Sequence, residues 1–199
     1  MQRHHLKLLF RPHAVAQILL GRWIGILFSK WFVNFLFQRI FRLNSDVPFQ
    51  VHFTSSVGVG KGIILGRNVW KSFALSGGCY IQGGNGVYIG DDTIFAPGVK
   101  IISANHARDD LHRWDPAPPI RIGKRCWIAS NSVILPGVQL GDDVIVGAGA
   151  VVTRSFPSGS VIGGVPARLI STQQSKGTWG YPCMCMAEER LRQRSPDQT

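Results

Sequence analysis

Aliphatic and aromatic side chains recur every six residues through most of this chain of 199 residues. A first run of such positions consists of Val51, Val57, Ile63, Val69, Leu75, Ile81 and Val87. A second run holds Ile89, Phe95 and Ile101, and a third holds Ile122, Ile128, Ile134, Leu140, Val146 and Val152. A six-residue period matches neither the turn of a helix nor the alternation of a strand, so it indicates a structural repeat.

This period predicts an all-β fold built as a coil with three flat sides. Each side holds a short strand and turns one aliphatic residue inward, so three sides of six residues close a coil of about eighteen residues. Gly and Asp often follow the aliphatic residue, as in Ile89-Gly90-Asp91-Asp92 and Leu140-Gly141-Asp142-Asp143. These residues suit tight corners, where a positive φ is costly for a branched side chain.

The fifth position of the repeat predicts a second inward place beside the aliphatic stack. It is mostly small or β-branched, at Ser55, Thr93, Val99, Ser132, Val138, Val144 and Ala150. Cys79 and Cys126 also occupy this position, and we interpret them as small apolar fillers. Lys61, Arg67 and Phe73 break the pattern, which indicates that the first coils are less regular than the last.

An ordered set of motifs within the repeat points to a known family. The motifs are Ile89-Gly90-Asp91-Asp92, Ser103-Ala104-Asn105-His106, Trp127-Ile128-Ala129-Ser130, Ile134-Leu135-Pro136-Gly137, Gly147-Ala148-Gly149, Val151-Val152-Thr153 and Gly164-Val165-Pro166-Ala167-Arg168. In this order they resemble the hexapeptide-repeat acyltransferases, and among these the sugar and polysaccharide O-acetyltransferases, alongside the maltose and galactoside acetyltransferases. The resemblance covers residues 50–171. It implies a left-handed parallel β-helix, which departs from the usual right-handed crossover, and a homotrimer with sites between subunits.

The repeat is interrupted between Ile101 and Ile122, whose spacing is not a multiple of six. The intervening loop, residues 103–121, is polar and rich in proline, so it must leave the coil. Insertions of this kind commonly carry the binding or catalytic groups of a repeat protein. In the resembling enzymes this loop reaches across a subunit boundary, and the histidine at its base, here His106, is the catalytic base.

The chemistry that the resemblance implies requires such a base. A sugar hydroxyl is a poor nucleophile at neutral pH, and a neutral imidazole can remove its proton as the oxygen attacks a thioester carbonyl. The proton then returns to the thiolate leaving group, while a backbone N–H stabilises the oxyanion. No covalent acyl-enzyme is required.

Other polar residues are candidates for supporting roles around this base. Three loop carboxylates are candidates to orient the imidazole, although a solvated acidic loop explains them equally well: Asp109, Asp110 and Asp115. The expected acceptor-binding residues are Asn85, Asn105 and Asp109. Asn85 also fits a turn asparagine, because it lies in Gly83-Gly84-Asn85-Gly86.

The resemblance also implies an acyl donor, acetyl-CoA, bound in the groove between coils that follow the loop. Ser130 and Ala148 match positions whose backbone groups hold the pantetheine arm, and Trp127 packs against that arm or is an ordinary surface aromatic. Thr153, Arg154 and Arg168 match positions near the nucleotide end, where a guanidinium suits a phosphate. Neither a dinucleotide-binding fingerprint nor a P-loop occurs in the sequence, which argues against a nicotinamide or ATP enzyme.

Ahead of the coils, residues 12–41 form an apolar and aromatic segment. It includes Trp23, Phe28, Trp31, Phe32, Phe35 and Phe37. Arg22 and Lys30 interrupt the segment, so it lacks the long uncharged run of an ordinary spanning helix. The same break, and the lack of a convincing cleavage site, argue against a cleaved signal peptide.

The charge of this segment suggests where it binds. Basic residues flank it at Arg3, Lys7, Arg11, Arg39 and Arg42, and the whole chain carries a formal net charge of +11. These charges favour a helical segment lying on an anionic membrane, at the cytoplasmic face of the inner membrane. The alternative is a helix packed on the coil or in an oligomer interface. Nucleic acid is set aside as a partner because no recognition motif accompanies the charge.

The tail, residues 172–199, lies outside the repeat. Cys183 and Cys185 within it cannot alone make a tetrahedral metal site, and we expect no metal cofactor. Four cysteines without a secretory context indicate free thiols in a reducing cytoplasm.

The chain is therefore expected to have a basic, apolar helical segment at residues 1–44, a β-helix domain at residues 45–171 and a tail. The expected function is transfer of an acetyl group from acetyl-CoA to a hydroxyl of a lipid-linked or surface-polysaccharide sugar. The alternatives are a longer-chain acyltransferase of lipid precursors, a zinc-dependent hydratase and a non-catalytic scaffold. A hydratase needs three histidines at metal spacing, whereas the loop holds only His106 and His112, and His52 lies far away. The ordered donor-side motifs argue against a scaffold.

Overall fold

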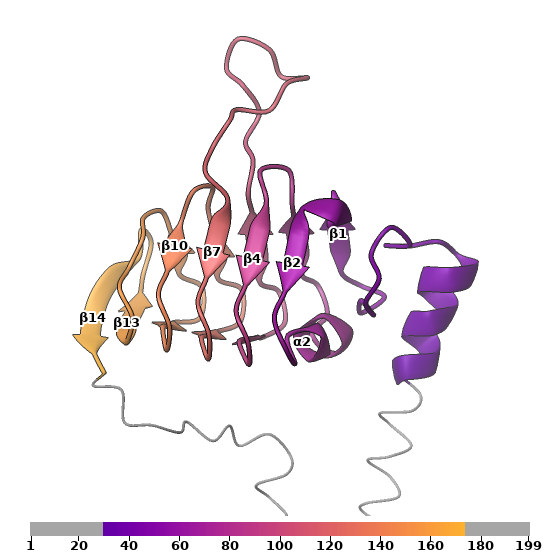
Figure 1. Ribbon diagram of the computed structural model, residues 1–199, viewed down its shortest axis with the longest axis horizontal. Helices are drawn as coiled ribbons and strands as arrows, with labels where there is room; N and C mark the ends of the chain where they lie inside the picture. The colour runs from indigo at the N-terminus through magenta and orange to yellow at the C-terminus, as the bar shows by residue number, and fades with distance from the viewer. Residues whose placement is uncertain (1–29, 174–199) are drawn as a thin grey trace, which may run out of the picture.

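Residues 30–173, the part of the chain that the computed structural model describes, form a three-sided coil of short parallel strands. Figure 1 shows the strands of each side stacked along the coil axis, a loop projecting from one corner and a helix beside the first coil. The expected left-handed parallel β-helix is confirmed. The expected helical segment before it is also confirmed within the described residues, where the helix is short.

Three sheets form the sides of the coil, and the chain visits them in the order A, B, C. Sheet A contains β1 (Ser56–Gly58), β3 (Tyr80–Gln82), β6 (Lys100–Ile102), β9 (Val133–Ile134) and β12 (Val151–Val152). Sheet B contains β2 (Ile63–Leu65), β4 (Val87–Ile89), β7 (Ile120–Ile122) and β10 (Gln139–Leu140). Sheet C contains β5 (Ile94–Phe95), β8 (Trp127–Ile128), β11 (Ile145–Val146), β13 (Ser160–Gly163) and β14 (Arg168–Thr172). Only β14 runs antiparallel to its neighbour in these sheets, and it covers the last coil.

The core is a set of aliphatic columns that run along the coil axis. In sheet A the column consists of Val57, Ile81, Ile101, Ile134 and Val152, which are paired in register and buried. In sheet C it consists of Phe95, Ile128, Val146 and Ile162. The fifth positions of the repeat are buried as expected, including Cys126 and Val144 with no exposed surface. Each fully buried Ile or Val contributes about 1.5 to 3 kcal/mol, so the columns are the main source of stability.

The length of each coil shows how the chain departs from its repeat. In the regular part, Ile134 pairs with Val152 eighteen residues later, as three hexads require. The coil from Ile81 to Ile101 takes twenty residues, because the turn that contains Asn85 adds two. The coil that contains the protruding loop is much longer, and Ile89 pairs with Ile122 thirty-three residues later.

The first full coil contains a helix where a sheet C strand was expected. The short 3₁₀ turn η2 (Gly60–Gly62) and β2 are followed by α2 (Trp70–Leu75). The expectation that Leu75 points inward is therefore wrong: its side chain is 44% exposed, whereas Phe73 is buried. Phe73 packs edge-on against Phe95 at 4.9 Å and so continues the sheet C column from a helix.

The helix α2 also completes the hydrogen bonding of sheet C at its edge. The backbone N–H of Phe95 donates to Ser72 Oγ at 3.1 Å, and Ser76 Oγ donates to the Phe95 carbonyl at 2.8 Å. Both serines are buried; Ser72 lies in the helix, and Ser76 is the residue that follows its last turn. They replace the backbone partners that a further strand would have provided.

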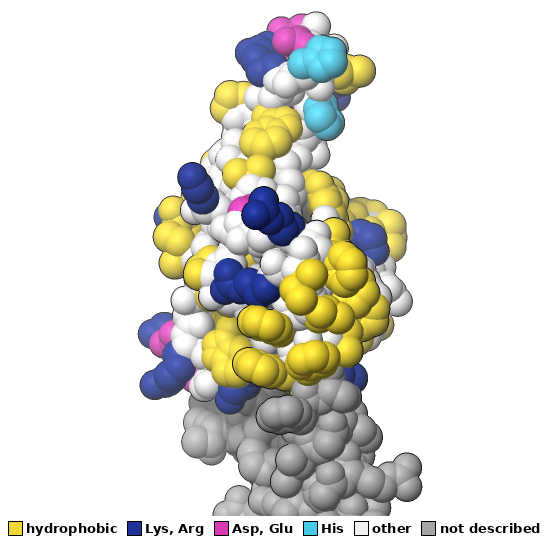
Figure 2. Space-filling model, turned by 90° about the vertical axis from the view of Figure 1, so that its right-hand side faces the viewer, with side chains coloured by type: hydrophobic (Ala, Val, Ile, Leu, Met, Phe, Trp, Pro, Cys, Tyr) yellow, Lys and Arg dark blue, Asp and Glu magenta, His cyan; other side chains and the backbone are white. Residues whose placement is uncertain are grey.

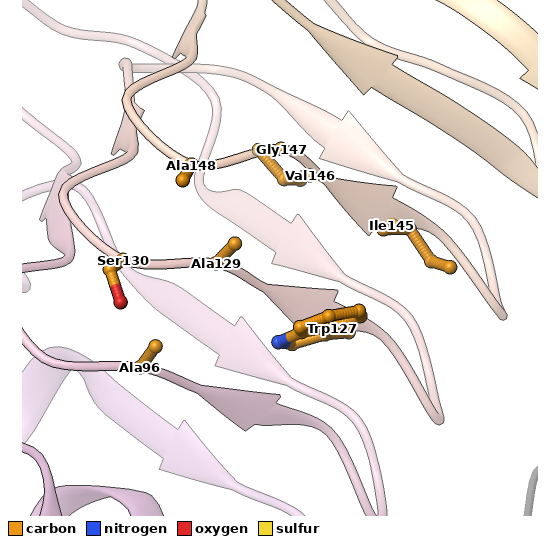
Figure 3. Close-up of a pocket in the computed structure, with 8 residues that line it drawn as sticks. All are labelled: Ala96, Trp127, Ala129, Ser130, Ile145, Val146, Gly147 and Ala148. Carbon is orange, nitrogen blue, oxygen red and sulfur yellow. The ribbon is translucent and has the colours of Figure 1, made fainter.

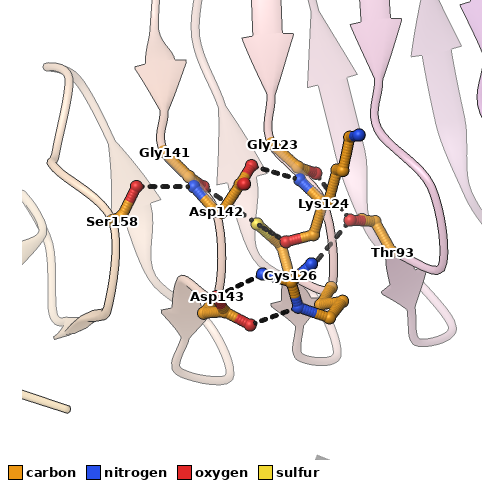
Figure 4. Close-up of polar contacts among 9 residues, drawn as sticks. Thr93, Gly123, Lys124, Cys126, Gly141, Asp142, Asp143 and Ser158 are labelled. Atoms are coloured by element: carbon orange, nitrogen blue, oxygen red, sulfur yellow. Dashed lines mark hydrogen bonds and ion pairs between the residues drawn. The ribbon is translucent and has the colours of Figure 1, made fainter. Parts of the chain in front are cut away.

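The corners between sheets B and C are built on a column of glycines: Gly66, Gly90, Gly123 and Gly141. A Cβ atom at Gly123 would lie 2.5 Å from the backbone carbon of Gly141, and the other three glycines meet the next coil at similar distances. The next residue links the coils through a side chain, since the Lys124 N–H donates to Asp142 Oδ1 and the Asp142 N–H donates to Ser158 Oγ (Figure 4). The corner sequence thus sets the close spacing of successive coils.

The second residue after each of these corner glycines has a left-handed backbone conformation. Asn68, Asp92, Arg125 and Asp143 have φ values of 66°, 58°, 54° and 57°. Asn and Asp tolerate this conformation, and Arg125 makes two hydrogen bonds to the Asp143 carboxylate, at 2.8 and 2.6 Å. Hydrogen bonds from Asn68 and Arg67 hold the pKa of the Asp92 carboxyl below its ordinary value. The charged corner is exposed, so its contribution to stability is modest.

The helix beside the first coil covers residues 30–40 and ends in a π-helical turn, η1 (Leu36–Ile40). It packs on the coil through two buried amides, Asn34 and Gln38. Asn34 Nδ2 donates to the Ala74 carbonyl at 2.9 Å, and Gln38 Nε2 donates to the Phe49 carbonyl at 2.8 Å. Among the described residues no helix has the length and apolar character that crossing a bilayer requires.

Replacing Gly123 with alanine is expected to destabilise the coil, because the new methyl group collides with backbone that cannot move aside. Overpacking of this kind costs about 1 to 3 kcal/mol, so the urea midpoint should fall at unchanged slope. Gly58→Ala is the matched control, since a Cβ there meets nothing closer than 3.8 Å. Equal midpoints for the two variants would show that the glycine column does not limit coil spacing.

Candidate functional site

The protruding loop is a hairpin that leaves the coil at the corner between sheets A and B. It begins after β6 and returns to β7, and Figure 1 shows it rising well clear of the strands. His106 and Trp114 form an antiparallel bridge, and the Ala107 N–H donates to the Arg113 carbonyl at 2.8 Å. These backbone bonds give the loop a defined shape, so His106 has a fixed place on it.

Three side chains fasten the base of this hairpin to the coil beneath it. The Asn85 amide donates to the carbonyls of Ser103 and Asp115, at 3.0 and 2.9 Å, and so joins both strands of the hairpin. The Ala104 N–H donates to Gln82 Oε1 at 2.9 Å. Ser103 Oγ accepts from the Asn85 N–H at 3.0 Å. Asn85 therefore supports the loop, and its expected role in binding the acceptor stays a prediction.

Packing against a glycine turn reinforces the same attachment. A Cβ atom at Gly84 would lie 2.8 Å from the ring of Trp114 and 3.0 Å from the Ala104 side chain. Gly86, with φ of 94°, faces Pro119 at the other end of the loop. The two-residue slip in the repeat therefore builds the turn on which the hairpin rests.

One ring nitrogen of His106 forms a hydrogen bond with the backbone of the loop. Its Nδ1 lies 2.6 Å from the Leu111 carbonyl oxygen. Because a carbonyl only accepts hydrogen bonds, Nδ1 must donate, and the neutral ring then carries its proton on Nδ1. The lone pair of the neutral imidazole is consequently on Nε2, which is the form that a general base needs.

Two of the three loop carboxylates expected to orient the imidazole have other partners, and the group that His106 Nδ1 contacts is a backbone carbonyl. Asp109 pairs with Arg113, four residues along the exposed tip. Asp110 Oδ1 accepts from the His112 N–H at 2.9 Å. The Asp115 N–H donates to the Asn105 carbonyl at 2.9 Å, and the Asn105 side chain is exposed. Sequence alone gave no signal for the Leu111 carbonyl, because any residue type supplies one.

A pocket of about 380 Å³ lies on sheet C and on the corner that leads from sheet C to sheet A. It is lined by Ala96, Trp127, Ala129, Ser130, Ile145, Val146, Gly147 and Ala148. Figure 3 shows the small residues Ala96, Ala129 and Gly147 at equivalent places on three successive coils, with Trp127 and Ile145 on the adjoining strands. The result is an apolar channel that crosses coils, and Trp127 forms one wall with a side chain that is 49% exposed.

The structure brings together three of the six residues expected to hold the acyl donor. Trp127, Ser130 and Ala148 all line this pocket. Thr153 and Arg154 follow β12 on the corner between sheets A and B, and Arg168 begins β14; all three are exposed and none lines the pocket. The Arg154 guanidinium lies over the Phe156 ring at 5.3 Å.

The remaining lining residues were missed because they look structural in the sequence. Ala96, Ala129 and Gly147 each follow an inward hydrophobic residue of the repeat, where a small residue suits a corner. Their recurrence at every coil on the same corner is the signal that distinguishes a channel from an isolated turn. Ile145 and Val146 belong to the repeat itself and carry no separate signal.

His106 and the pocket occupy different corners of one chain. His106 stands at the corner between sheets A and B, whereas the pocket lies at the corner between sheets C and A. Neither His106 nor any other loop residue lines the pocket. On one chain the loop and the pocket therefore do not adjoin.

The cysteines have environments that suit packing. Burial raises the pKa of the Cys126 thiol to about 11 and raises that of Cys79 as well, so both remain protonated at neutral pH. Within residues 30–173 no three His, Cys, Asp or Glu side chains cluster as a metal site would require. Cys183 and Cys185, with the rest of the tail, lie outside the described residues.

Comparison with known proteins finds similarity to hexapeptide-repeat transferases and to acetyltransferases. Residues 119–154 match the family model described as bacterial transferase hexapeptide (six repeats). The chain is 38% identical over 114 residues to galactoside O-acetyltransferase of Escherichia coli K12, across 56% of this chain and 54% of that protein. It is 33% identical over 146 residues to a provisionally named lipopolysaccharide biosynthesis O-acetyl transferase, WbbJ, of the same organism, across 65% of this chain and 73% of that protein. The match thus spans about half the length of the first relative and nearly three quarters of the second.

Solved structures of similar proteins contain coenzyme A or acetyl coenzyme A. A galactoside acetyltransferase in complex with coenzyme A shares 30% identity, with a TM-score of 0.53 and coverage of 64% of each chain. A hexapeptide-repeat acetyltransferase of Vibrio cholerae in complex with acetyl coenzyme A shares 26% identity, with a TM-score of 0.53 and coverage of 61% of this chain and 66% of that one.

Removing the Asn85 side chain is expected to loosen the base of the loop. Asn85→Ala loses two hydrogen bonds that span the hairpin, at a local cost of about 1 to 3 kcal/mol. Amide hydrogen exchange in residues 103–119 should become faster by about five-fold to a hundred-fold. Asp109→Ala, which removes only the exposed ion pair at the tip, is the control and should leave exchange at the hairpin base unchanged. Unaltered exchange in Asn85→Ala would mean that the loop is held in another way.

Proposed function

This chain belongs to the bacterial hexapeptide-repeat transferase family, and from that premise we propose that it is an O-acetyltransferase that moves an acetyl group from acetyl-CoA to a sugar hydroxyl. The observation that carries the proposal is the engaged Nδ1 of His106, which leaves Nε2 as the basic nitrogen at the base of an exposed loop. The apolar channel that crosses three coils supports the donor half of the proposal, because it suits the thin pantetheine arm of coenzyme A.

His106 acts as the general base of the proposed reaction. Its Nε2 takes the proton of the acceptor hydroxyl as that oxygen attacks the thioester carbonyl carbon. The carbon–sulfur bond then breaks, and the imidazolium returns the proton to the departing thiolate, so coenzyme A leaves as a thiol. The hydrogen bond from Nδ1–H to the Leu111 carbonyl strengthens when the ring becomes positively charged, which favours the intermediate.

The donor lies along the channel with its acyl end toward the catalytic corner. In this arrangement Trp127 covers the arm from one side, and the backbone groups of Ser130 and Ala148 bond to its amides; the support is that all three residues line the channel. Arg154 and Arg168 are exposed cations outside the channel, and they suit the phosphates of the nucleotide end. Their place beyond the pocket fits a ligand longer than the pocket itself.

The active assembly is proposed to be a homotrimer with its sites between subunits. The support is the separation of His106 from the pocket on one chain, which makes a single copy incomplete. A closed cyclic arrangement presents the loop corner of each copy to the pocket corner of the next, so every copy gives and receives one half-site.

The acceptor is proposed to be a lipid-linked or surface-polysaccharide sugar at the cytoplasmic face of the inner membrane. The similarity to a relative named for lipopolysaccharide biosynthesis supports this acceptor class. The net charge of +11 and the exposed aromatic side chains of the helix at residues 30–40 support contact with an anionic bilayer. Confinement to that surface raises the effective concentration of a membrane-borne acceptor.

His106→Ala is expected to lower turnover by about a hundred-fold to ten-thousand-fold, the usual contribution of a positioned general base. Release of coenzyme A from acetyl-CoA, measured against a panel of soluble galactosides and lipid-linked glycans, reports the change. Equilibrium binding of coenzyme A should be preserved, since the pocket is untouched. His112→Ala on the same loop is the matched control and should retain activity; wild-type turnover in His106→Ala would rule out the assigned base.

Two inactive variants are expected to restore one another if each site is shared between copies. Ala148→Phe fills the channel and His106→Ala removes the base, so each alone should be inactive. In trimers mixed from equal amounts after unfolding and refolding together, about a quarter of the sites combine an intact loop with an intact channel. Recovery of about a quarter of wild-type turnover is the expected result. No recovery, in trimers shown to be mixed by mass spectrometry, would place both halves of the site on one chain.

A further inference from the structure

The helix beside the first coil buries polar side chains and exposes apolar ones, which is the reverse of an ordinary amphipathic helix. Its buried residues are polar: Asn34 is 1% exposed and Gln38 is 4% exposed. Its outward residues are large and apolar. We call them, with the turn that follows, the N-terminal apolar face: Trp31 51%, Phe32 55%, Phe35 42%, Ile40 64%, Phe41 61% and Leu43 47% exposed.

The polar side of the helix has a structural reason to face the coil. The first coil ends in backbone groups that lack a preceding strand, and the two amides bond to several of them. Asn34 Oδ1 accepts from the Phe53 N–H at 3.1 Å, and Gln38 Oε1 accepts from the Val51 N–H at 3.3 Å. Since these contacts fix the rotation of the helix, the aromatic side chains are held on the outside.

The charges around the face are mostly positive. Lys30, Arg39 and Arg42 are exposed on the same segment. Asp46 is the only acidic residue between positions 30 and 50, and its Oδ2 accepts from the Gly60 N–H of the coil at 3.1 Å. Figure 2 shows hydrophobic side chains gathered over this end of the molecule with Lys and Arg side chains among them.

The face continues onto the coil itself. Phe37 joins the helix to the coil, since its ring lies 5.1 Å from that of Phe53, which is itself 38% exposed. Phe37 also lies 5.2 Å from Phe41. The apolar surface is therefore supported by the β-helix and does not depend on the helix alone.

We propose that the N-terminal apolar face binds the surface of an anionic lipid bilayer, with Phe32, Phe35, Ile40 and Phe41 at the level of the acyl chains and Arg39 and Arg42 at the lipid phosphates. This inference deepens the proposed function and rests on its membrane-borne acceptor. Large exposed apolar side chains, together with three exposed cations and a single acidic residue, are typical of interfacial membrane anchors.

A lipid surface suits this face better than a second copy of it. Two such faces brought together would place Lys30, Arg39 and Arg42 opposite the same cations, which is unfavourable when the charges are desolvated. Lipid phosphates neutralise them instead. In the proposed cyclic trimer the three copies of the face lie at the same height along the symmetry axis, so they can meet one bilayer together and multiply a weak individual contact.

The test measures flotation of the full chain with phosphatidylcholine vesicles, with and without phosphatidylserine, at low and high salt. The wild-type protein should bind the anionic vesicles, and salt should weaken the binding. The triple variant Phe32→Ser, Phe35→Ser, Phe41→Ser should bind at least about ten-fold more weakly, because it loses most of the buried apolar area. Arg39→Gln should lose about five-fold on anionic vesicles only.

The matched control is Leu169→Ser with Ile170→Ser, which removes exposed apolar side chains from β14 at the opposite end of the coil. It should bind vesicles as the wild type does. Wild-type binding by the triple variant would overturn the proposal, and so would a change in its oligomeric state by light scattering, which would make the face a contact between copies. Turnover of a soluble galactoside should persist in the triple variant; if vesicle binding behaves as expected while turnover is absent from the wild type, the proposed function fails and the membrane surface stands.

Discussion

Close stacking of successive coils is the constraint on which the rest of the structure depends. At the corners between sheets B and C the backbones approach so closely that a single methyl group on Gly123 would meet the next coil at 2.5 Å. That spacing allows the strands to pair in parallel and the aliphatic columns to close, from Val57 through Ile81 to Val152. Because the close corners leave little room for expansion, extra residues either form a compact helix, as in α2, or leave the coil. The loop that carries His106 is the largest such departure, so the same constraint that builds the scaffold exposes the proposed base.

The two half-sites follow from this geometry. The channel needs three coils in register, since Ala96, Ala129 and Gly147 come from three successive turns of the chain. The hairpin needs the slip at Asn85, which gives the turn that holds both of its strands. A rigid three-sided coil keeps the two halves on separate corners, and an assembly of copies is the simplest way to join them. The N-terminal apolar face at the first coil gives such an assembly one end with exposed aromatic side chains.

The sequence predicted those features that depend on the repeat. The inward columns, the second inward position at Cys126 and Val144, and the exit of the loop after Ile101 all follow from a six-residue period. The helix α2 could not be predicted, because Val69 and Leu75 satisfy the period while Phe73 and the two serines that bond to Phe95 act through contacts distant in sequence. The partner of His106 was also beyond sequence, since a carboxylate has a recognisable side chain and the Leu111 carbonyl does not. The rotation of the helix at residues 30–40 depends on hydrogen bonds from Asn34 and Gln38 to backbone groups of the coil. The pattern of hydrophobic residues does not predict these bonds.

The most direct measurement of the central claim is a structure of the protein with coenzyme A and an acceptor sugar bound. We expect coenzyme A in the channel between Trp127 and Ala148 of one copy, and the acceptor hydroxyl within about 2.6 to 3.2 Å of His106 Nε2 from a neighbouring copy, with Nδ1 still bonded to Leu111. Coenzyme A bound away from that channel, or His106 turned away from the acceptor, would contradict the shared site and its base.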